Sequence, residues 1–146
     1  MKINDNNLKL DGKDLKIAIV LPYFNDKLGL KLYQSCKEEL IKHGVEESNI
    51  NLTRVAGALE TPFAAQKIIK TQKPNALIAM GIVIRGETPH FDLVAQTTHQ
   101  ALMNIQLKLE TPIIFNILTT ENLAQAQARI HKGAEAAQAA IIQAKL

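Results

Sequence analysis

The chain has 146 residues, of which 47% are hydrophobic and 21% are charged, and its formal net charge is +3 at pH 7. This length favours one domain, residues 1–146, and the composition is typical of a soluble globular protein rather than a disordered one. The lysines are scattered without a basic run and only 4% of the residues are aromatic, so a nucleic-acid-binding protein is not expected.

The sequence also argues against a membrane protein and against a metal site. No apolar stretch reaches the roughly 18 residues of a membrane span, and the N-terminus lacks a hydrophobic signal region, so we expect a cytoplasmic protein. The one cysteine, Cys36, is expected to be a small buried residue of a helix. The histidines and this cysteine do not have the spacing of metal ligands.

Four short apolar runs alternate with helical patterns along the chain. The runs cover residues 16–21, 50–55, 76–84 and 112–118. The first, third and fourth are apolar on both alternating faces, as expected for strands that helices cover on both sides of a parallel sheet. We therefore expect a strand at each run.

Helices are expected after each strand, over residues 28–43, 62–72, 89–109 and 121–145. The last of these segments is rich in alanine, and Gly133 within it permits a kink. The fourfold β-α alternation predicts an α/β protein: a three-layer α/β/α sandwich with a four-stranded parallel sheet, flavodoxin-like, with right-handed crossovers.

The carboxyl ends of parallel strands meet at one edge of the sheet, where ligands of α/β proteins collect. Four segments should lie there, residues 23–25, 57–60, 82–90 and 115–120. We expect them to form one crevice.

Residues 81–92, with the sequence GIVIRGETPHFD, are the most informative segment. His90 is expected at a strand-to-helix turn, where an imidazole can carry protons, although a lone histidine is as often structural. His99 should face the opposite side of the same helix. Gly81 and Gly86 have the spacing of a P-loop, but no Lys-Ser/Thr follows, so the loop is expected to hold a single phosphate at most.

Several other residues have both a functional and a structural interpretation. Arg129 can grip a phosphate through paired donors or belong to a solvated polar stripe. Phe24 and Phe115 can stack on a planar ring or pack in the core. Glu60 can accept hydrogen bonds from substrate hydroxyls or cap the helix that starts near Pro62. Together they favour a site for a planar polar ring and a small phosphorylated molecule.

From about Lys16 to the C-terminus, the sequence resembles the lumazine synthase family of riboflavin biosynthesis. Residues 81–92 are close to the family pattern G-x-V-I-R-G-x-T-x-H-[FY]-[DE], which is highly specific. Further matches follow in the family's order, at Phe24-Asn25, Gly57-Ala58-Leu59-Glu60, Phe115, Leu118 to Asn122, Gln125-Ala126 and Arg129. The resemblance implies a transferase that condenses 5-amino-6-(D-ribitylamino)uracil with 3,4-dihydroxy-2-butanone 4-phosphate, giving 6,7-dimethyl-8-ribityllumazine, phosphate and water.

The resemblance also implies a role for each matching residue. His90 would act as general acid and base, without a metal or an organic cofactor. The pyrimidine and ribityl chain would be bound by Phe24, Ala58, Leu59, Glu60, Ile82, Val83, Ile84 and Phe115. The butanone phosphate would be bound by Gly86, Glu87, Thr88 and Arg129.

Family members form ring-shaped pentamers in which a neighbouring subunit supplies the residues matching Phe115 and Arg129. The resemblance therefore implies a homo-oligomer, a pentamer or a multiple of pentamers, with active sites at the subunit interfaces. Residues 1–15 would form an N-terminal extension that can pair with a neighbouring subunit.

The sequence departs from the family pattern in two places. Leu59 replaces an aromatic residue and Ala56 replaces a proline. Residues 130–134 form a shorter junction than in many members, and Lys132 is a candidate for one of the lysines usually found there. Because this junction influences assembly, a pentamer, a decamer and a sixty-subunit shell all stay open.

Three other functions fit parts of the sequence less well. An archaeal-type riboflavin synthase is disfavoured because His90 and Arg129 are both present. A non-catalytic lumazine- or flavin-binding protein would not need the phosphate-binding residues. A receiver-type signalling domain would carry an acidic cluster after the first strand, where the sequence has Pro-Tyr-Phe-Asn instead.

Overall fold

The computed structural model describes residues 2–5 and 7–146 of the chain. Residues 1 and 6 of the expected N-terminal extension lie outside the described residues. In chain order, the elements are β1 (Ile17–Pro22), α1 (Asp26–Lys42), η1 (Glu47–Asn49), β2 (Ile50–Val55), η2 (Ala58–Glu60), α2 (Thr61–Gln72), β3 (Ala76–Ile84), α3 (His90–Leu109), β4 (Ile113–Thr120), α4 (Leu123–Gln127) and α5 (Lys132–Gln143).

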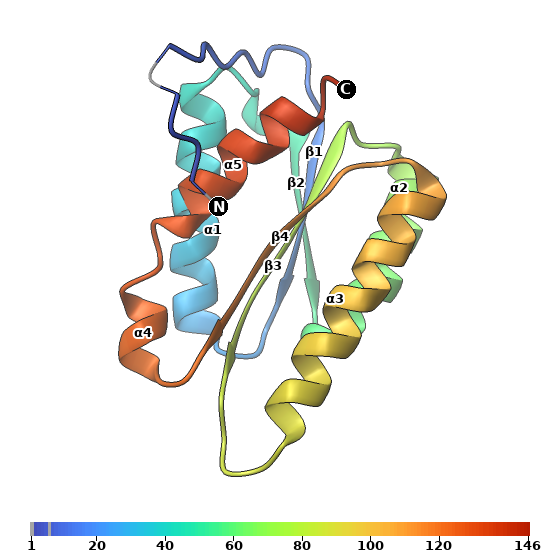
Figure 1. Cartoon of the computed structure of the whole chain (residues 1–146). Coiled ribbons are helices and arrows are strands. Elements are labelled where there is room, and N and C mark those ends of the chain that lie inside the picture. Colours follow the sequence, from blue (N-terminus) through green and yellow to red (C-terminus); the bar gives the residue numbers. More distant parts are fainter. Residues whose placement is uncertain (1, 6) are drawn as a thin grey trace.

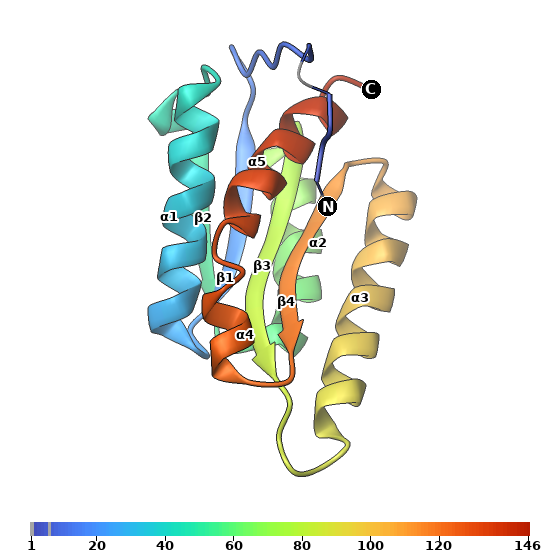
Figure 2. The same cartoon turned by 60° about the vertical axis from the view of Figure 1, so that its left-hand side comes forward.

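The four strands form one parallel sheet in the order β2-β1-β3-β4. Helices α1, α4 and α5 lie on one side of this sheet, and α2 and α3 lie on the other (Figures 1 and 2). The predicted three-layer α/β/α sandwich with a four-stranded parallel sheet is confirmed. The strand order changes direction beside β1 and β3, so a crevice is expected at their carboxyl ends.

The core consists of a separate apolar layer on each face of the sheet. Ile17, Ile19 and Leu21 of β1 point toward α1 and α5, whereas Ala18 and Val20 point toward α2 and α3. This two-sided burial explains why the runs of β1 and β3 lack polar residues. It also confines the polar chemistry to the loops at the strand ends.

Cys36 is fully buried on α1, as expected from the sequence. Burial raises the pKa of its thiol well above the ordinary value, so the thiolate form is disfavoured. A structural role is therefore assigned to this residue.

The prediction of one helix over residues 121–145 is wrong. Strand β4 extends to Thr120, and the chain then forms two helices separated by residues 128–131. The Asn122 side chain accepts a hydrogen bond from Gln125 N and so starts α4, while Asn116 Nδ2 donates to Lys132 O at 2.7 Å and anchors the start of α5. These contacts come from tertiary structure, which the high helix propensity of alanine does not reveal.

Gly133 does not form the kink that the sequence suggested. It lies inside the first turn of α5, after the break, and a Cβ atom placed on it would overlap the carbonyl oxygen of Leu32. Glycine is needed here because α5 approaches the backbone of α1 closely.

Within the described part of the chain, no helix is both long and apolar enough to cross a membrane.

Candidate functional site

Three loops meet at the carboxyl ends of β1, β2 and β3 and enclose a pocket of about 340 Å³. They are the β1–α1 loop, the η2 segment and the β3–α3 turn. The residues that line the pocket are Pro22, Phe24, Gly57, Ala58, Leu59, Glu60, Ile82, Val83, Ile84, Gly86, Thr88, His90, Phe91 and Val94. Most of the side chains singled out in the sequence are therefore brought together, although they come from three separate segments.

Phe24 lies on the β1–α1 loop, and its ring is 67% exposed. The loop is fixed by Asn25, which adopts a left-handed backbone conformation (φ 57°) and whose Nδ2 donates to Ile82 O at 2.8 Å. Asparagine tolerates this conformation better than most residues. The exposed ring thus stands on a fixed support beside the end of β3, where a planar ligand could stack on it.

Arg54 of β2 also fixes this loop, a role that is not apparent from the sequence pattern. Its Nε donates to Leu21 O at 3.1 Å, its guanidinium pairs with Asp26, and it lies 4.2 Å from the centroid of the Tyr23 ring. These partners of Arg54 lie about thirty residues before it in the chain, and the parallel pairing of β1 with β2 brings them next to it.

Glu60 belongs to η2 and lines the pocket. The alternative that it caps α2 is not supported, because the Glu60 side chain makes no capping hydrogen bond there. A Cβ atom on Gly57 would lie 3.0 Å from Glu60 Oε2, so the carboxylate rests against the glycine backbone. Leu59 beside it is 46% exposed. A carboxylate and an exposed apolar side chain therefore share this wall.

The β3–α3 turn carries His90 as the first residue of α3. The backbone N–H of His90 donates to Thr88 Oγ1 at 3.4 Å. A Cβ atom on Gly86 would meet nothing within 4 Å, so the turn is open to the solvent. Gly86, Thr88 and His90 line the pocket, whereas Glu87 is exposed on the turn outside the pocket lining. The helix N-terminus and this open turn suit a small anion.

Arg85 precedes the turn, and its role is not apparent from the sequence pattern. Its guanidinium donates to both carboxylate oxygens of Asp92, at 3.0 and 3.1 Å, and to Glu121 Oε2 at 2.8 Å. The hydrogen bond from Arg85 holds the pKa of the Asp92 carboxyl below its usual value. Arg85 itself stays charged, since the hydrogen bonds that it donates to Asp92 and Glu121 raise its pKa above the ordinary value.

Arg129 and Phe115 do not join this pocket, so the expectation of one crevice from four loops is wrong. Phe115 is the third residue of β4, opposite Ala79, rather than at the carboxyl end of the strand. Arg129 lies in the turn between α4 and α5, not inside a helix, and its Nη1 donates to Gln125 O at 2.9 Å. Both residues line a second hollow of about 250 Å³ along β4.

Lys132 lines the same second hollow, a few residues after Arg129. Its Nζ donates to Glu135 Oε2 at 2.7 Å, and this hydrogen bond raises the pKa of the lysine. Two cations and one aromatic ring are therefore gathered on β4, α5 and the preceding turn, apart from His90.

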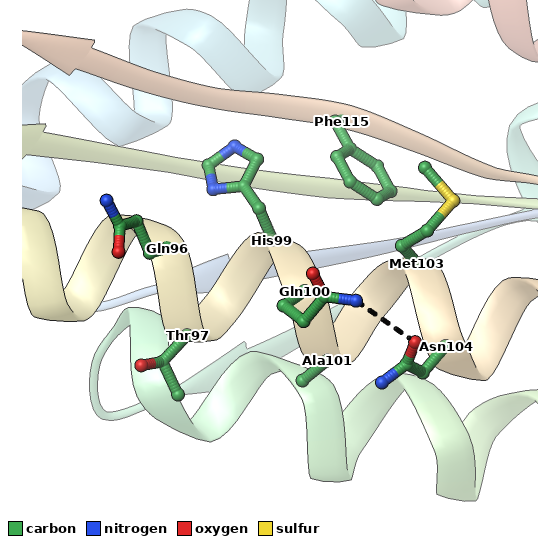
Figure 3. A pocket seen from close by; sticks show the side chains of 8 residues that line it. All are labelled: Gln96, Thr97, His99, Gln100, Ala101, Met103, Asn104 and Phe115. Atoms are coloured by element: carbon green, nitrogen blue, oxygen red, sulfur yellow. Dashed lines mark hydrogen bonds between the residues drawn. The ribbon is translucent and has the colours of Figure 1, made fainter.

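The other face of Phe115 borders a hollow along α3 (Figure 3). The His99 ring packs edge-on against Phe115, with ring centroids 5.5 Å apart, and His99 Nδ1 lies 2.6 Å from Ala95 O. His90 and His99 thus line different hollows, as their spacing on the helix predicted. Among the described residues, no cluster of His, Cys, Asp and Glu side chains could hold a metal ion.

Comparison with known proteins connects this geometry to one family. Residues 14–146 match the family described as 6,7-dimethyl-8-ribityllumazine synthase. Proteins of that name from Polaromonas sp. strain JS666 and Paracidovorax citrulli are 49% and 47% identical to the chain over 139 residues, which cover 94% of this chain and 90% of each relative. One from Nitrosospira multiformis is 47% identical over 138 residues, covering 94% of this chain and 86% of the relative.

The family match spans nearly all of the folded chain, including every loop of the pocket and the second hollow along β4. The chain belongs to the 6,7-dimethyl-8-ribityllumazine synthase family, whose members are transferases of riboflavin biosynthesis.

Proposed function

We propose that the pocket at the ends of β1, β2 and β3 binds 5-amino-6-(D-ribitylamino)uracil and that His90 moves protons during its condensation with 3,4-dihydroxy-2-butanone 4-phosphate. The observation that carries this assignment is the convergence of Phe24, Glu60 and His90 on one pocket. We also propose a cytoplasmic location, as expected from the sequence.

The walls of the pocket suit the two parts of the ribitylaminopyrimidine. The exposed ring of Phe24 offers a stacking surface for the pyrimidine, and Leu59 offers an apolar contact on the opposite loop. The Glu60 carboxylate can accept hydrogen bonds from ribityl hydroxyls. Ala58 and the end of β3, residues 82–84, complete the proposed binding surface.

The β3–α3 turn suits the second substrate. Gly86, Glu87 and Thr88 form an open turn at the N-terminus of α3, where the helix dipole favours an anion. His90 lies two residues after Thr88 and lines the same pocket as the proposed pyrimidine site. A histidine in this position can accept and return protons during imine formation, elimination of phosphate and ring closure.

Arg129 and Phe115 are proposed to serve the site of a neighbouring subunit. In one chain they line a different hollow from His90, although the proposed chemistry needs a phosphate-binding cation beside the turn. A homo-oligomer, a pentamer or a multiple of pentamers, would bring the two hollows together. Catalysis then comes from positioning two reactants and transferring protons.

The test is incubation of the purified protein with both substrates while the absorbance of the lumazine product is followed. We expect product to form faster than in the uncatalysed reaction, and equal rates would contradict the proposal. A parallel sample with 6,7-dimethyl-8-ribityllumazine alone should give no riboflavin, which separates this function from that of a riboflavin synthase.

The Arg129→Ala variant tests the phosphate-binding role. We expect the KM for the butanone phosphate to rise about tenfold or more, because a charge-assisted bidentate contact is lost, while the KM for the pyrimidine changes little. An unchanged KM for the phosphorylated substrate would show that Arg129 does not bind the phosphate.

A further inference from the structure

Arg85 joins three parts of the fold that surround the proposed site. Its backbone N–H donates to Thr120 O at 2.9 Å, and its guanidinium binds Asp92 of α3 and Glu121 of the β4–α4 loop. The same guanidinium lies 4.3 Å from the centroid of the Phe91 ring. All five donor positions of a guanidinium have fixed directions, so such contacts define an orientation and not only an attraction.

The contact with Asp92 connects the two ends of the β3–α3 turn. Arg85 stands directly before the turn and Asp92 in the first turn of the helix that follows, so the bidentate pair spans residues 86–91. Backbone hydrogen bonds from Asp92 N and Leu93 N to Pro89 O begin α3, and the side-chain hydrogen bond described within the turn is the long one from His90 N to Thr88 Oγ1. The position of His90, two residues before Asp92, therefore depends on the Arg85–Asp92 pair.

The contact with Glu121 reaches the segment that carries Arg129. Glu121 accepts from Arg85 Nε through its carboxylate, and its backbone N–H donates to the side-chain oxygen of Gln125 at 2.8 Å. Arg129 Nη1 in turn donates to the backbone oxygen of Gln125. A continuous set of hydrogen bonds thus connects Arg85 with the guanidinium of Arg129.

We propose that Arg85 is a positioning residue that fixes the His90 turn through Asp92 and the Arg129 segment through Glu121. This inference rests on the proposed function of His90 and Arg129. Arg85, Asp92 and Glu121 are all partly or largely exposed, and exposed ion pairs contribute little to folding stability. Their loss should therefore change the kinetic constants much more than the thermal unfolding midpoint.

Arg85→Ala is expected to lower kcat about tenfold and to raise the KM for the butanone phosphate, because misplacing reacting groups by a fraction of an ångström is costly. Arg85→Lys should restore only part of the activity, since an ammonium cannot reproduce the bidentate geometry. If only the positive charge of Arg85 mattered, Arg85→Lys would have full activity. Thermal unfolding midpoints of both variants should stay close to that of the wild type.

The two carboxylates separate the two branches of the network. Asp92→Ala should lower kcat with little change in either KM, whereas Glu121→Ala should mainly raise the KM for the butanone phosphate. The control is Glu47→Gln, which removes the Lys37–Glu47 ion pair at the opposite end of the sheet and should leave all kinetic constants unchanged.

Wild-type kinetic constants in Arg85→Ala, beside an impaired His90→Ala, would overturn the positioning role and leave the proposed function intact. So would a loss in Arg85→Ala that neither Asp92→Ala nor Glu121→Ala shares. Wild-type constants in His90→Ala and Arg129→Ala would instead contradict the proposed function itself.

Discussion

His90 is the side chain on which the proposed chemistry depends, and its setting favours proton transfer over a structural role. It begins α3, lines the pocket that holds Phe24 and Glu60, and faces a turn that is open to solvent. A structural histidine would be expected to be held by fixed partners, as the half-buried His99 is by Phe115 and Ala95 O.

We predict that His90→Ala lowers kcat about a hundredfold, at the low end of what general acid–base catalysis supplies, because the pocket still positions both substrates. The KM values should change little. Initial rates of lumazine formation at varied substrate concentrations measure this split. His43→Gln, at the end of α1, is the matched control, and an undiminished kcat in His90→Ala would exclude a proton-transfer role.

The pocket residues that belong to one short motif could be predicted from the sequence. His90, Gly86 and Thr88 follow from the pattern of residues 81–92, and the structure places all three in the pocket. Arg54 was missed because its partners are distant in sequence. One partner of Arg85, Glu121, also lies 36 positions away, whereas Asp92 lies only seven positions away and its pairing depends on the path of the turn between them. The sequence around a single cationic residue does not indicate which carboxylate the fold will place beside it.

At the scale of elements, the contact between α1 and α5 depends on the absence of a side chain at Gly133. A Cβ atom there would overlap Leu32 O and lie 3.0 Å from Cys36 N, and backbone atoms of a packed helix cannot move aside easily. This helix pair covers the face of the sheet that holds Ile17 and Ile78.

We predict that Gly133→Ala lowers the free energy of unfolding by about 2 kcal/mol or more, since overpacking outweighs the gain of about 1 kcal/mol in helix propensity. Urea unfolding at equal protein concentration measures the change. Gly86→Ala is the control for stability, because a Cβ atom there meets open space. A stability of Gly133→Ala equal to that of the wild type would show that the two helices separate without cost.

Glu39 adds a polar contact to the same helix pair. Gln138 Nε2 of α5 donates to Glu39 Oε1 at 2.8 Å, and His43 Nε2 lies 2.9 Å from the same oxygen. Burial alone would raise the pKa of this carboxyl, but the hydrogen bonds from Gln138 and His43 outweigh it and hold the pKa below its ordinary value. The ionised carboxylate is therefore stabilised in the folded state.

Because the folded-state pKa of Glu39 is depressed, its contribution is complete above the unfolded pKa of about 4.5 and disappears as the pH falls through the lower folded value. We predict that Glu39→Gln costs about 1 kcal/mol of unfolding free energy at pH 7 and less at pH 3, which lies below the unfolded pKa. Urea unfolding at both pH values measures this. Glu38→Gln is the solvent-facing control, and an equal cost of Glu39→Gln at both pH values would contradict the assignment.

The element pattern was predictable because periodicity and turn residues agree with the sheet topology for β1, β3 and β4 and for the helices α1 and α3. The break between α4 and α5 was not, because it is set by Asn116 and Asn122, which act through hydrogen bonds formed only after β4 is in place. Alanine-rich sequence favours helix on both sides of the break and does not place it.

At the scale of the whole molecule, the proposed site is divided between two hollows of one chain. His90 lies at the carboxyl ends of the strands, whereas Arg129 and Phe115 lie along β4, the edge strand of the sheet. A cyclic oligomer with head-to-tail contacts places unlike surfaces of two copies against each other, so each chain could give one half-site and receive the other.

We predict that two impaired variants restore activity when they assemble together. If His90→Ala and Arg129→Ala are co-expressed in equal amounts, about a quarter of the interfaces should combine an intact His90 with an intact Arg129, on random mixing in a cyclic assembly. The rate of lumazine formation at low butanone phosphate should then exceed the mean of the two separate variants. The control is His90→Ala with the double variant His90→Ala/Arg129→Ala, in which no chain carries His90 and no interface regains it. A mixture of the single variants that only averages their rates would instead place both residues in the site of one chain, because a site within one chain gains nothing from a different neighbour.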